Sequence, residues 1–503
     1  MKRLILVTIM CSAVWFSLYF ESAGICETQK QNKNLSRNCY MGFTTWPYDV
    51  TTDAVLDTYQ KIRDHGDIIA VHWDEGIPWP EAYDQRSYPY DLEYTLQFMQ
   101  NQIGTDETVY LGISALNMSR NGMALYRGNS PNQPLPSPWS TYAFDDEHVI
   151  TAYTNFCLDL IARFNPAYVN YSIEASELLF ASPEKWNEFT VFMQEVSTRI
   201  KYEHPSLPLC LSIALKHPDS SEMLFLADRL REMLPYIDFL GGSVYPYIFY
   251  GLESGGDPAQ LPLDWLYQLE ELAQGKPTAI TETGWIAEDL VIDSLGVSIA
   301  GTPEWQASYI DRLMWESDQM EMLFVIWFTI VDYDALWDTL PESMKELALI
   351  WRDTGLYSSG SPPQPRIALN NWDQWLMRLK TPSKPCIRTG VNVIMPSTFF
   401  HPNDTAALTI YVCNDLESPI KNHPLFLILD IYGNYYYAPS FSGIDYYNHS
   451  YESGHNVIEV VPEFYWPFGT GHYENINWYC ALLTPAMNAI YGEYDIFRFG
   501  WTE

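Results

Sequence analysis

Short apolar runs alternate with amphipathic segments from residue 37 to about residue 380. Most of the runs are bounded at one end by Gly, Pro, Asp or Asn, which is typical of buried parallel strands. The runs lie at residues 40–45, 67–73, 109–116, 168–174, 209–215, 239–245, 278–283 and 323–330.

The segments between the runs have the apolar spacing of helices. From Val149 to Phe164, apolar residues recur at spacings of three and four, which predicts one buried helix face. Asp145-Asp146 precede this helix as a cap, and Asn165-Pro166 end it. Another helix is predicted to begin with Thr302 as its cap and Pro303 in its first turn.

Eight strands alternating with helices predict a (β/α)8 TIM barrel over residues 37–380. A doubly wound sheet is the alternative fold. That fold usually carries a glycine-rich turn between strand and helix, and the sequence contains neither GxGxxG nor GxxxxGK[ST]. The pattern therefore favours the barrel.

After residue 380 the pattern changes to β-prone segments, and residues 381–503 are predicted to form an accessory β-sandwich domain. Gly433-Asn434 is a candidate hairpin turn. Tyrosine clusters at 435–437 and 446–447, with Trp466, would either grip sugar or pack internally. The strands are expected at residues 391–395, 408–413, 425–432, 457–461, 476–483 and 496–501.

The charge and the aromatic content limit the class of partner. A formal charge of −35 over 503 residues argues against nucleic acid and against strongly anionic polymers. The 18 Trp and 36 Tyr residues suit stacking on flat, uncharged ligands such as sugars. We expect a monomer with a neutral carbohydrate substrate and no cofactor.

The N-terminus has the composition of an export signal. Lys2-Arg3 precede a mostly apolar run that ends at small residues, so residues 1–24 are predicted to be a signal peptide and 25–36 a linker. The protein would then be secreted, periplasmic or at the cell surface. A retained membrane anchor and a lipid anchor on Cys26 are the alternatives, and no later segment has the length and hydropathy of a membrane span.

The cysteines show no CxxC pair and no regular spacing, so they indicate neither a zinc site nor a disulfide framework. Export would permit one or two bridges. Cys157 falls on the apolar face of a predicted helix and is expected to be buried.

Two glutamates follow predicted strands on opposite sides of the barrel. Catalytic groups of barrel enzymes lie at the C-terminal ends of strands, where Glu174 follows strand four and Glu282 follows strand seven. A buried carboxylate without a partner is costly, so Glu282 before Gly284-Trp285 indicates function or a buried ion pair. Paired carboxylates at a barrel mouth suit glycoside hydrolysis, in which the acid should have a raised pKa and the nucleophile a lower one.

Three blocks resemble retaining glycoside hydrolases of clan A. They are Thr281–Trp285 (TETGW), residues 237–247 (IDFLGGSVYPY) and Ile326–Phe328 (IWF), and the barrel is most similar to arabinogalactan endo-β-1,4-galactanases of family 53. Asp353-Thr-Gly-Leu-Tyr-Ser-Ser-Gly resembles the segment before the last barrel helix of such enzymes. The resemblance covers residues 36–380 only.

The resemblance implies a retaining, endo-acting β-glycosidase. In it, Glu174 is the acid/base, Glu282 the nucleophile, Tyr245 a partner of the nucleophile and Trp327 a sugar platform. This sequence has Ile173 where the clan usually has Asn, so Glu177 is a rival for the acid. A carbohydrate-binding barrel that has lost catalysis is the alternative function.

Further residues are expected around the mouth as substrate contacts. His72 and Asp74 follow strand two; without an HExxH motif they suit sugar hydroxyls or internal polar contacts better than a metal. Asn117 follows strand three and Lys216-His217 follow strand five. Tryptophans near the mouth would line sugar subsites or belong to the core: Trp46, Trp79, Trp139, Trp285 and Trp327.

Overall fold

The computed structural model describes residues 36–502, except 105–106, 253–254, 381–385, 387–388, 397–398 and 468–470. Two compact units divide the chain: Asn38–Met377 form one, and the flanking residues belong to the other. The predicted signal peptide and the linker up to residue 35 lie outside the described residues. Among the described helices, none is both long enough and apolar enough to cross a bilayer.

Residues Asn38–Met377 form the predicted (β/α)8 barrel. One parallel sheet has the order β6-β5-β4-β3-β2-β12-β9-β8-β7. Because β6 and β7 are separated by Leu211 alone, they are two pieces of one strand, and their pairing with β5 and β8 closes the ring. The strands are β2 (Tyr40–Thr44), β3 (Ile68–Trp73), β4 (Val109–Ile113), β5 (Tyr168–Asn170), β6 (Leu209–Cys210), β7 (Ser212–Ala214), β8 (Leu240–Val244), β9 (Thr278–Thr283) and β12 (Phe324–Trp327).

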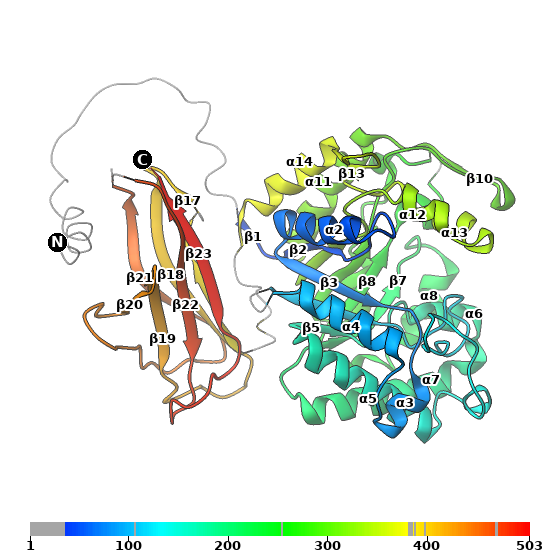
Figure 1. The fold of residues 1–503 in the computed structure, drawn as a ribbon, viewed down its shortest axis with the longest axis horizontal. Helices are drawn as coiled ribbons and strands as arrows, with labels where there is room; N and C mark the ends of the chain where they lie inside the picture. The colour runs from blue at the N-terminus through cyan, green and yellow to red at the C-terminus, as the bar shows by residue number, and fades with distance from the viewer. Residues whose placement is uncertain are drawn as a thin grey trace. The chain divides into compact units, whose positions relative to one another are not determined.

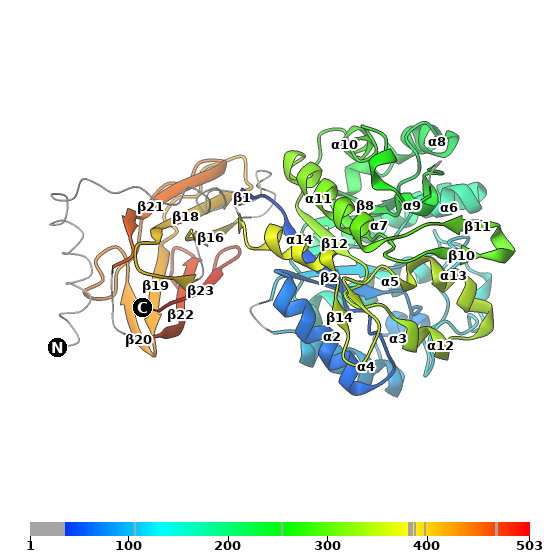
Figure 2. The ribbon, with the colours of Figure 1, turned by 90° about the horizontal axis from the view of Figure 1, so that it is seen from above.

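Helices surround the strands on the outside (Figures 1 and 2). The caps read from the sequence are confirmed: Asp146 accepts a hydrogen bond from the His148 amide at one helix, and Thr302 accepts one from the Trp305 amide at another. The helices are α2 (Thr52–His65), α3 (Trp79–Asp84), α4 (Tyr90–Gln102), α5 (Glu147–Phe164), α6 (Ser176–Ala181), α7 (Trp186–Glu203), α8 (Ser221–Leu230), α9 (Pro246–Phe249), α10 (Gln268–Ala273), α11 (Pro303–Gln319), α12 (Asp334–Thr339), α13 (Glu342–Arg352) and α14 (Ile367–Leu376).

Aromatic side chains fill the barrel interior below the mouth. The ring of Phe324 lies 4.8 Å from that of Tyr110 and 5.1 Å from that of Tyr168, between centroids. Above them, the buried Asn170 amide donates to Tyr110 Oη at 3.0 Å and to Ser212 Oγ at 2.9 Å. The interior is therefore a packed core, and the ionisable groups collect at the C-terminal ends of the strands.

Two short hairpin-like pairs lie among the barrel loops, and one pair of parallel two-residue strands lies beside the boundary of the units. The loop pairs are β10 (Leu290–Ile292) with β11 (Val297–Ile299) and β13 (Tyr357–Ser358) with β14 (Gln364–Pro365); the boundary pair is β1 (Ser36–Arg37) with β15 (Leu379–Lys380).

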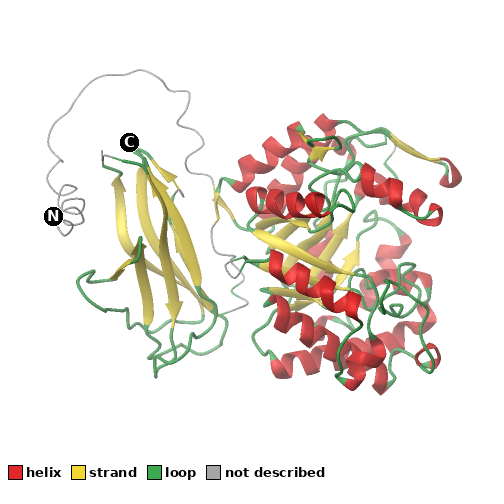
Figure 3. Ribbon diagram, in the orientation of Figure 1, coloured by secondary structure: helices red, strands yellow, loops and turns green. Residues whose placement is uncertain are grey.

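The C-terminal unit is the predicted β-sandwich, with strands and no helix among its described residues (Figure 3). Leu408, Ile410 and Val412 alternate with half-buried residues, as the period-two pattern predicts. Its sheets are β16 (Gly390–Ile394), β18 (Thr405–Asn414) and β21 (Gly454–Tyr465); and β17 (Phe399–Phe400), β23 (Asp495–Trp501), β22 (Tyr473–Leu482), β19 (Leu425–Ile431) and β20 (Asn434–Tyr437).

Two local features of the sandwich differ from the sequence expectation or add to it. The β19–β20 hairpin turns at Tyr432-Gly433, both with positive φ, so the turn lies one residue earlier than predicted. A disulfide joins Cys386 to Cys413, although the cysteine spacing gave no sign of a pairing. Cys157 is buried in α5, as expected.

Candidate active site

Glu174 and Glu282 both lie at the C-terminal mouth of the barrel. Glu174 lies four residues after the end of β5, and Glu282 is the next-to-last residue of β9. Their side chains remain 21% and 15% exposed, so solvent and ligand can reach both carboxylates although most of each side chain is covered.

Glu282 is held by one group beside the neighbouring strand β8 and by another in β3, across the mouth. Tyr245 directly follows β8, and its hydroxyl donates a hydrogen bond to Glu282 Oε1 at 2.6 Å. His72 in β3 places its Nδ1 3.5 Å from Glu282 Oε2. Both partners act on the carboxylate itself, which fixes its orientation at the mouth.

Glu174 is held from three directions. Its Oε1 accepts a hydrogen bond from Ser243 Oγ at 2.8 Å, and its Oε2 accepts from Arg120 Nε at 3.2 Å and Nη2 at 3.1 Å. Its own amide donates to Ser212 Oγ at 2.9 Å. Glu174 has φ 50°, a left-handed conformation that is uncommon outside glycine and that such contacts must stabilise.

Ser243 joins the two carboxylates geometrically. In the β8–β9 pairing, Ser243 is the register partner of Glu282, and its hydroxyl is the group that contacts Glu174. Side chains two residues apart on an extended segment point the same way, so Ser243 and Tyr245 both point inward, one to each glutamate. Glu174, after β5, and Glu282, in β9, therefore both contact the segment of β8 that ends at the mouth.

The protonation of the pair differs from the expectation. Burial raises the pKa of Glu282, and the charge of Glu174 raises it further, while His72 and Tyr245 offset part of the effect. Burial acts in the same direction on Glu174, but Arg120 and Ser243 outweigh it and lower the pKa of Glu174. The higher pKa of the pair therefore belongs to Glu282, whereas the sequence interpretation expected the raised pKa on Glu174.

Glu177, the rival acid, lies beside the pair in α6. Burial raises the pKa of Glu177, and Lys216 opposes this shift through an ion pair at 3.0 Å. Lys216, which follows strand five, therefore pairs with Glu177 inside the site. Glu177 is close enough to Glu174 for their charges to interact, but Glu177 pairs with Lys216 and Glu174 with Arg120.

His72 and Asp74 form a second charged group on the other side of Glu282. His72 Nε2 lies 3.7 Å from Asp74 Oδ2. Burial would lower the pKa of His72, but Asp74 and Glu282 outweigh it and raise it. Both predicted residues are therefore at the mouth, where Glu282 acts on the pKa of His72, and His72 and Arg120 lower the pKa of Asp74.

Trp327 and Trp285 are core residues, which corrects their expected place in the sugar site. Both indoles are fully buried and donate to backbone oxygens, Trp327 to Thr354 at 2.9 Å and Trp285 to Gly256 at 2.9 Å. Neither ring has a face open to a ligand. Trp79 and Trp139 are also buried and stack on one another, with ring centroids 5.9 Å apart.

Aromatic residues at the ends of neighbouring strands take the place expected for Trp327. Trp46, after β2, and Phe328, after β12, are half-buried, and their ring centroids lie 5.7 Å apart. The Trp46 Nε1 atom has no hydrogen-bond partner among the described residues. This pair offers an apolar surface beside the mouth, whereas the Trp46 Nε1 atom is itself buried.

Asn117 organises a loop instead of projecting into the site. Its side chain donates to Asn121 Oδ1 at 2.9 Å and accepts from the Asn121 amide at 3.1 Å. The turn so formed carries Arg120, which the sequence interpretation missed. The only available signal was its position in a loop after a barrel strand, where functional residues concentrate.

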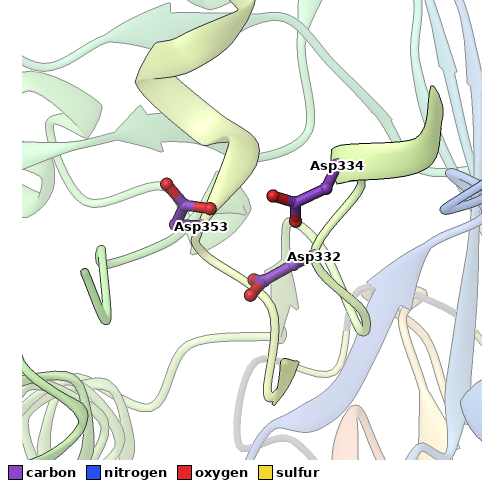
Figure 4. Close-up of side chains that lie close together, drawn as sticks. All are labelled: Asp332, Asp334 and Asp353. Carbon is purple, nitrogen blue, oxygen red and sulfur yellow. The ribbon is translucent and has the colours of Figure 1, made fainter. Parts of the chain in front are cut away.

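Asp332, Asp334 and Asp353 meet in the segments after β12 and after α13, and their carboxylate oxygens lie within 4.8 Å of one another (Figure 4). Arginines offset their charges. Arg366 Nη1 lies 2.6 Å from Asp332 Oδ2, and Arg352 pairs with Asp353 at 2.8 Å and with Asp334 at 3.8 Å. The cluster is therefore an internal ion-pair network, in which guanidinium groups supply the positive charge.

No protein-family profile and no curated protein matches the chain. Its fold is similar to a Bacteroides uniformis β-glucuronidase (11% identity, TM-score 0.40, 93% of this chain and 46% of that one). It is also similar to a Ruminococcus gnavus β-glucuronidase solved with D-glucuronic acid (13% identity, TM-score 0.39, 71% of this chain and 53% of that one). A third similar structure is an exo-β-1,4-mannosidase from Opitutaceae bacterium strain TAV5 (12% identity, TM-score 0.47, 69% of this chain and 61% of that one).

The chain spans about half the length of the β-glucuronidases that it matches. At these identities and TM-scores, the matches do not assign an activity or a substrate to the chain.

Proposed function

We propose that this chain is a retaining β-glycoside hydrolase that cleaves a neutral poly- or oligosaccharide by double displacement. The observation that carries the proposal is the meeting of Glu174 and Glu282 at the barrel mouth, each with its own hydrogen-bond donor from β8 or the residue after it. Retaining cleavage uses two carboxyl groups about 5–5.5 Å apart, one as nucleophile and one as acid and then base.

In this mechanism Glu282 is the nucleophile. Tyr245 donates to Glu282 Oε1, and His72 lies beside its other oxygen, so both partners stabilise the ionised form that attacks the anomeric carbon. Glu174 protonates the leaving oxygen and afterwards takes a proton from water. The covalent glycosyl-enzyme forms on Glu282 and is then hydrolysed.

The charges at the mouth support a neutral substrate. Arg120, Lys216 and His72 each lie beside a carboxylate of the site. No cation of this group is left over for a substrate carboxylate or sulfate, and the formal charge of −35 repels anionic polymers. By the resemblance of its motifs, the leading substrate is a β-1,4-galactan cleaved in endo mode.

The disulfide Cys386–Cys413 supports the proposal that the protein is exported, because such bonds persist in oxidising compartments. The Tyr and Trp residues of the β-sandwich agree with a carbohydrate environment, but packing accounts for Trp466, whose ring stacks on Phe400 with centroids 4.7 Å apart.

The test compares Glu282→Ala with Glu270→Ala, a matched change at an exposed glutamate of α10. We expect Glu282→Ala to lose about 10⁴-fold or more in kcat on a panel of β-linked polysaccharides, and Glu270→Ala to be unaffected. Circular dichroism checks the fold of both. Normal turnover by Glu282→Ala would contradict the proposal, and NMR of the first-formed anomer would contradict retention if the anomer is inverted.

A second candidate function is a carbohydrate-binding barrel without catalysis. The observation that favours it is that both Glu174 oxygens accept hydrogen bonds, from Ser243 and from Arg120. Calorimetry on the same polysaccharide panel separates the two functions: binding without product by the wild-type protein would support the binding barrel.

A further inference from the structure

Arg120 reaches the active site from an exposed turn. The turn follows β4, its tip carries Met118 with 45% exposure, and the Arg120 amide donates to the Asn117 carbonyl at 2.8 Å. In contrast to the tip, the Arg120 side chain is only 14% exposed. Its backbone has φ 52°, so Arg120 and Glu174 both adopt the left-handed conformation.

The guanidinium group of Arg120 is committed to one carboxylate oxygen. Its Nε and Nη2 both contact Glu174 Oε2, and its Nη1 donates to Ser114 Oγ at 3.1 Å. Strained backbone at two residues that contact each other is a common feature of functional sites, where surrounding contacts must maintain it.

These contacts conflict with the task of an acid catalyst. Oε2 accepts two guanidinium N–H groups, and Oε1 accepts the Ser243 hydroxyl. A carboxyl group that donates a proton must carry hydrogen on one oxygen and point it at the leaving group. Oε2 cannot do so while Arg120 fills both of its acceptor positions, and Oε1 has only the acceptor position that Ser243 leaves free.

We propose that Arg120 is a positioning residue that holds Glu174 as a hydrogen-bond acceptor and is displaced from it when sugar binds. The inference rests on the proposed function, because the Arg120–Glu174 contact can control catalysis only if Glu174 is the acid of a hydrolase. Displacement by a sugar hydroxyl would free Oε2 to carry the proton toward the glycosidic oxygen.

The site offers Arg120 a place to go. Asp74 and Glu282 both attract its charge, and both lie on the neighbouring side of the mouth. The other groups that face Glu174 are Lys216 after β7, Glu177 in α6, and Ser243 and Tyr245 on the β8 side. Among these groups, Arg120 and Lys216 are the cations, and Lys216 remains paired with Glu177.

The first experiment measures the effect of Arg120 on the pKa of Glu174 and does not require turnover. The ¹³C-carboxyl resonance of Glu174 is titrated in protein labelled at glutamate, and Glu174→Gln identifies the signal by its loss. Arg120→Met should move the midpoint of Glu174 upward by about 1–3 pH units, because an adjacent cation lowers a carboxyl pKa by that amount. Arg120→Lys keeps the charge and should give a smaller shift.

Two controls make this result specific. Arg199→Met removes an arginine that pairs with Glu147 on the outer helices, and it should leave the Glu174 midpoint unchanged. Lys216→Met should shift it less than Arg120→Met. An unchanged midpoint in Arg120→Met, or in Arg120→Lys if the methionine variant does not fold, would overturn the proposal.

The second experiment tests displacement, with β-1,4-galactotetraose as the probe, because its leaving group needs protonation by the acid. The pH profile of kcat/KM reports the free enzyme, and that of kcat reports the complex. The basic limb of kcat should lie at higher pH than that of kcat/KM in the wild type, and the difference should vanish in Arg120→Met. Coincident wild-type limbs would refute displacement.

The two experiments separate the failure of this inference from the failure of the proposed function. If the probe and the polysaccharide panel are not cleaved at all, the proposed function is wrong. The carboxyl titration still decides in that case whether Arg120 holds Glu174 as an acceptor.

Discussion

Tyr245 donates a 2.6 Å hydrogen bond to Glu282 and lies two residues beyond Ser243, which donates to Glu174. One strand and its immediate extension therefore position both carboxylates. Ser243 and Tyr245 are two residues apart on an extended segment, so their side chains point to the same face. A shift of one residue in the pairing of this strand would turn both donors away from the site. The most direct tests of the site begin with these contacts.

Tyr245→Phe removes the hydroxyl and keeps the ring. The lost hydrogen bond should raise the pKa of Glu282, since the Tyr245 bond lowers it. We expect kcat to fall by about 10–100-fold, with the basic limb of the rate profile, which follows the higher pKa of Glu282, at higher pH. Steady-state kinetics across pH measure both effects. Tyr247→Phe, which loses a bond to the Ile350 carbonyl, is the control and should leave the limb in place.

The pair should give a bell-shaped profile of kcat/KM. The pKa of Glu174 lies below its ordinary value of 4.5, and that of Glu282 lies above its ordinary value of 4.5. When the pH is below both pKa values, no carboxylate is ionised and able to attack. When the pH is above both pKa values, no carboxyl group has a proton to donate. The active form carries one proton, so we expect one limb on each side of pH 4.5, belonging to the pair as a whole.

Substitution of each candidate acid distinguishes Glu174 from Glu177. Glu174→Gln should lose about 10²–10⁴-fold on substrates whose leaving group needs protonation, and much less on activated aryl glycosides. Glu177→Gln leaves the pair in place and should change both substrates equally and by less. Added azide should restore Glu174→Gln alone, with a β-glycosyl azide as product. The opposite pattern would make Glu177 the acid.

The strands, and with them the two glutamates, could be predicted from the sequence for a physical reason. A barrel strand is buried on both sides, so it is a continuous apolar run with clear ends. Glu282 stands out because it ends such a run. The sequence does not show which group balances its charge, since His72 and Tyr245 come from other strands.

Arg120 and Trp327 show where prediction fails. Arg120 lies in an exposed polar turn, and only the folded chain directs its side chain back toward Glu174. For Trp327, the β9–β12 pairing changes register between Val325 and Trp327. The extra residue of this irregularity lies in β9, because β12 pairs regularly with β2. The apolar run 323–330 does not show which of its aromatic residues faces the mouth; in the fold Trp327 is buried and Phe328 lies beside Trp46.

The two tryptophans should therefore respond differently to substitution. Trp327→Phe should lower the free energy of unfolding by about 2 kcal/mol, because it loses packing and the bond to Thr354, and should leave KM unchanged. Trp46→Ala should raise KM severalfold with a smaller loss of stability. Urea denaturation and steady-state kinetics on both variants measure the contrast. A raised KM in folded Trp327→Phe would return this residue to the sugar site.

The disulfide should stabilise the β-sandwich unit. It joins Cys386, ahead of β16, to Cys413 in β18, with a sequence separation of 27. Closing a loop of this length restricts the unfolded chain, which is worth about 3 kcal/mol. Dithiothreitol should therefore lower the unfolding temperature of this unit in the wild type, measured by calorimetry. Cys386→Ser should show the same lower temperature and no further response to the reductant, because Cys480 and the other described thiols outside the bridge are already reduced. An identical transition with and without dithiothreitol in the wild type would mean that the bridge contributes nothing to stability.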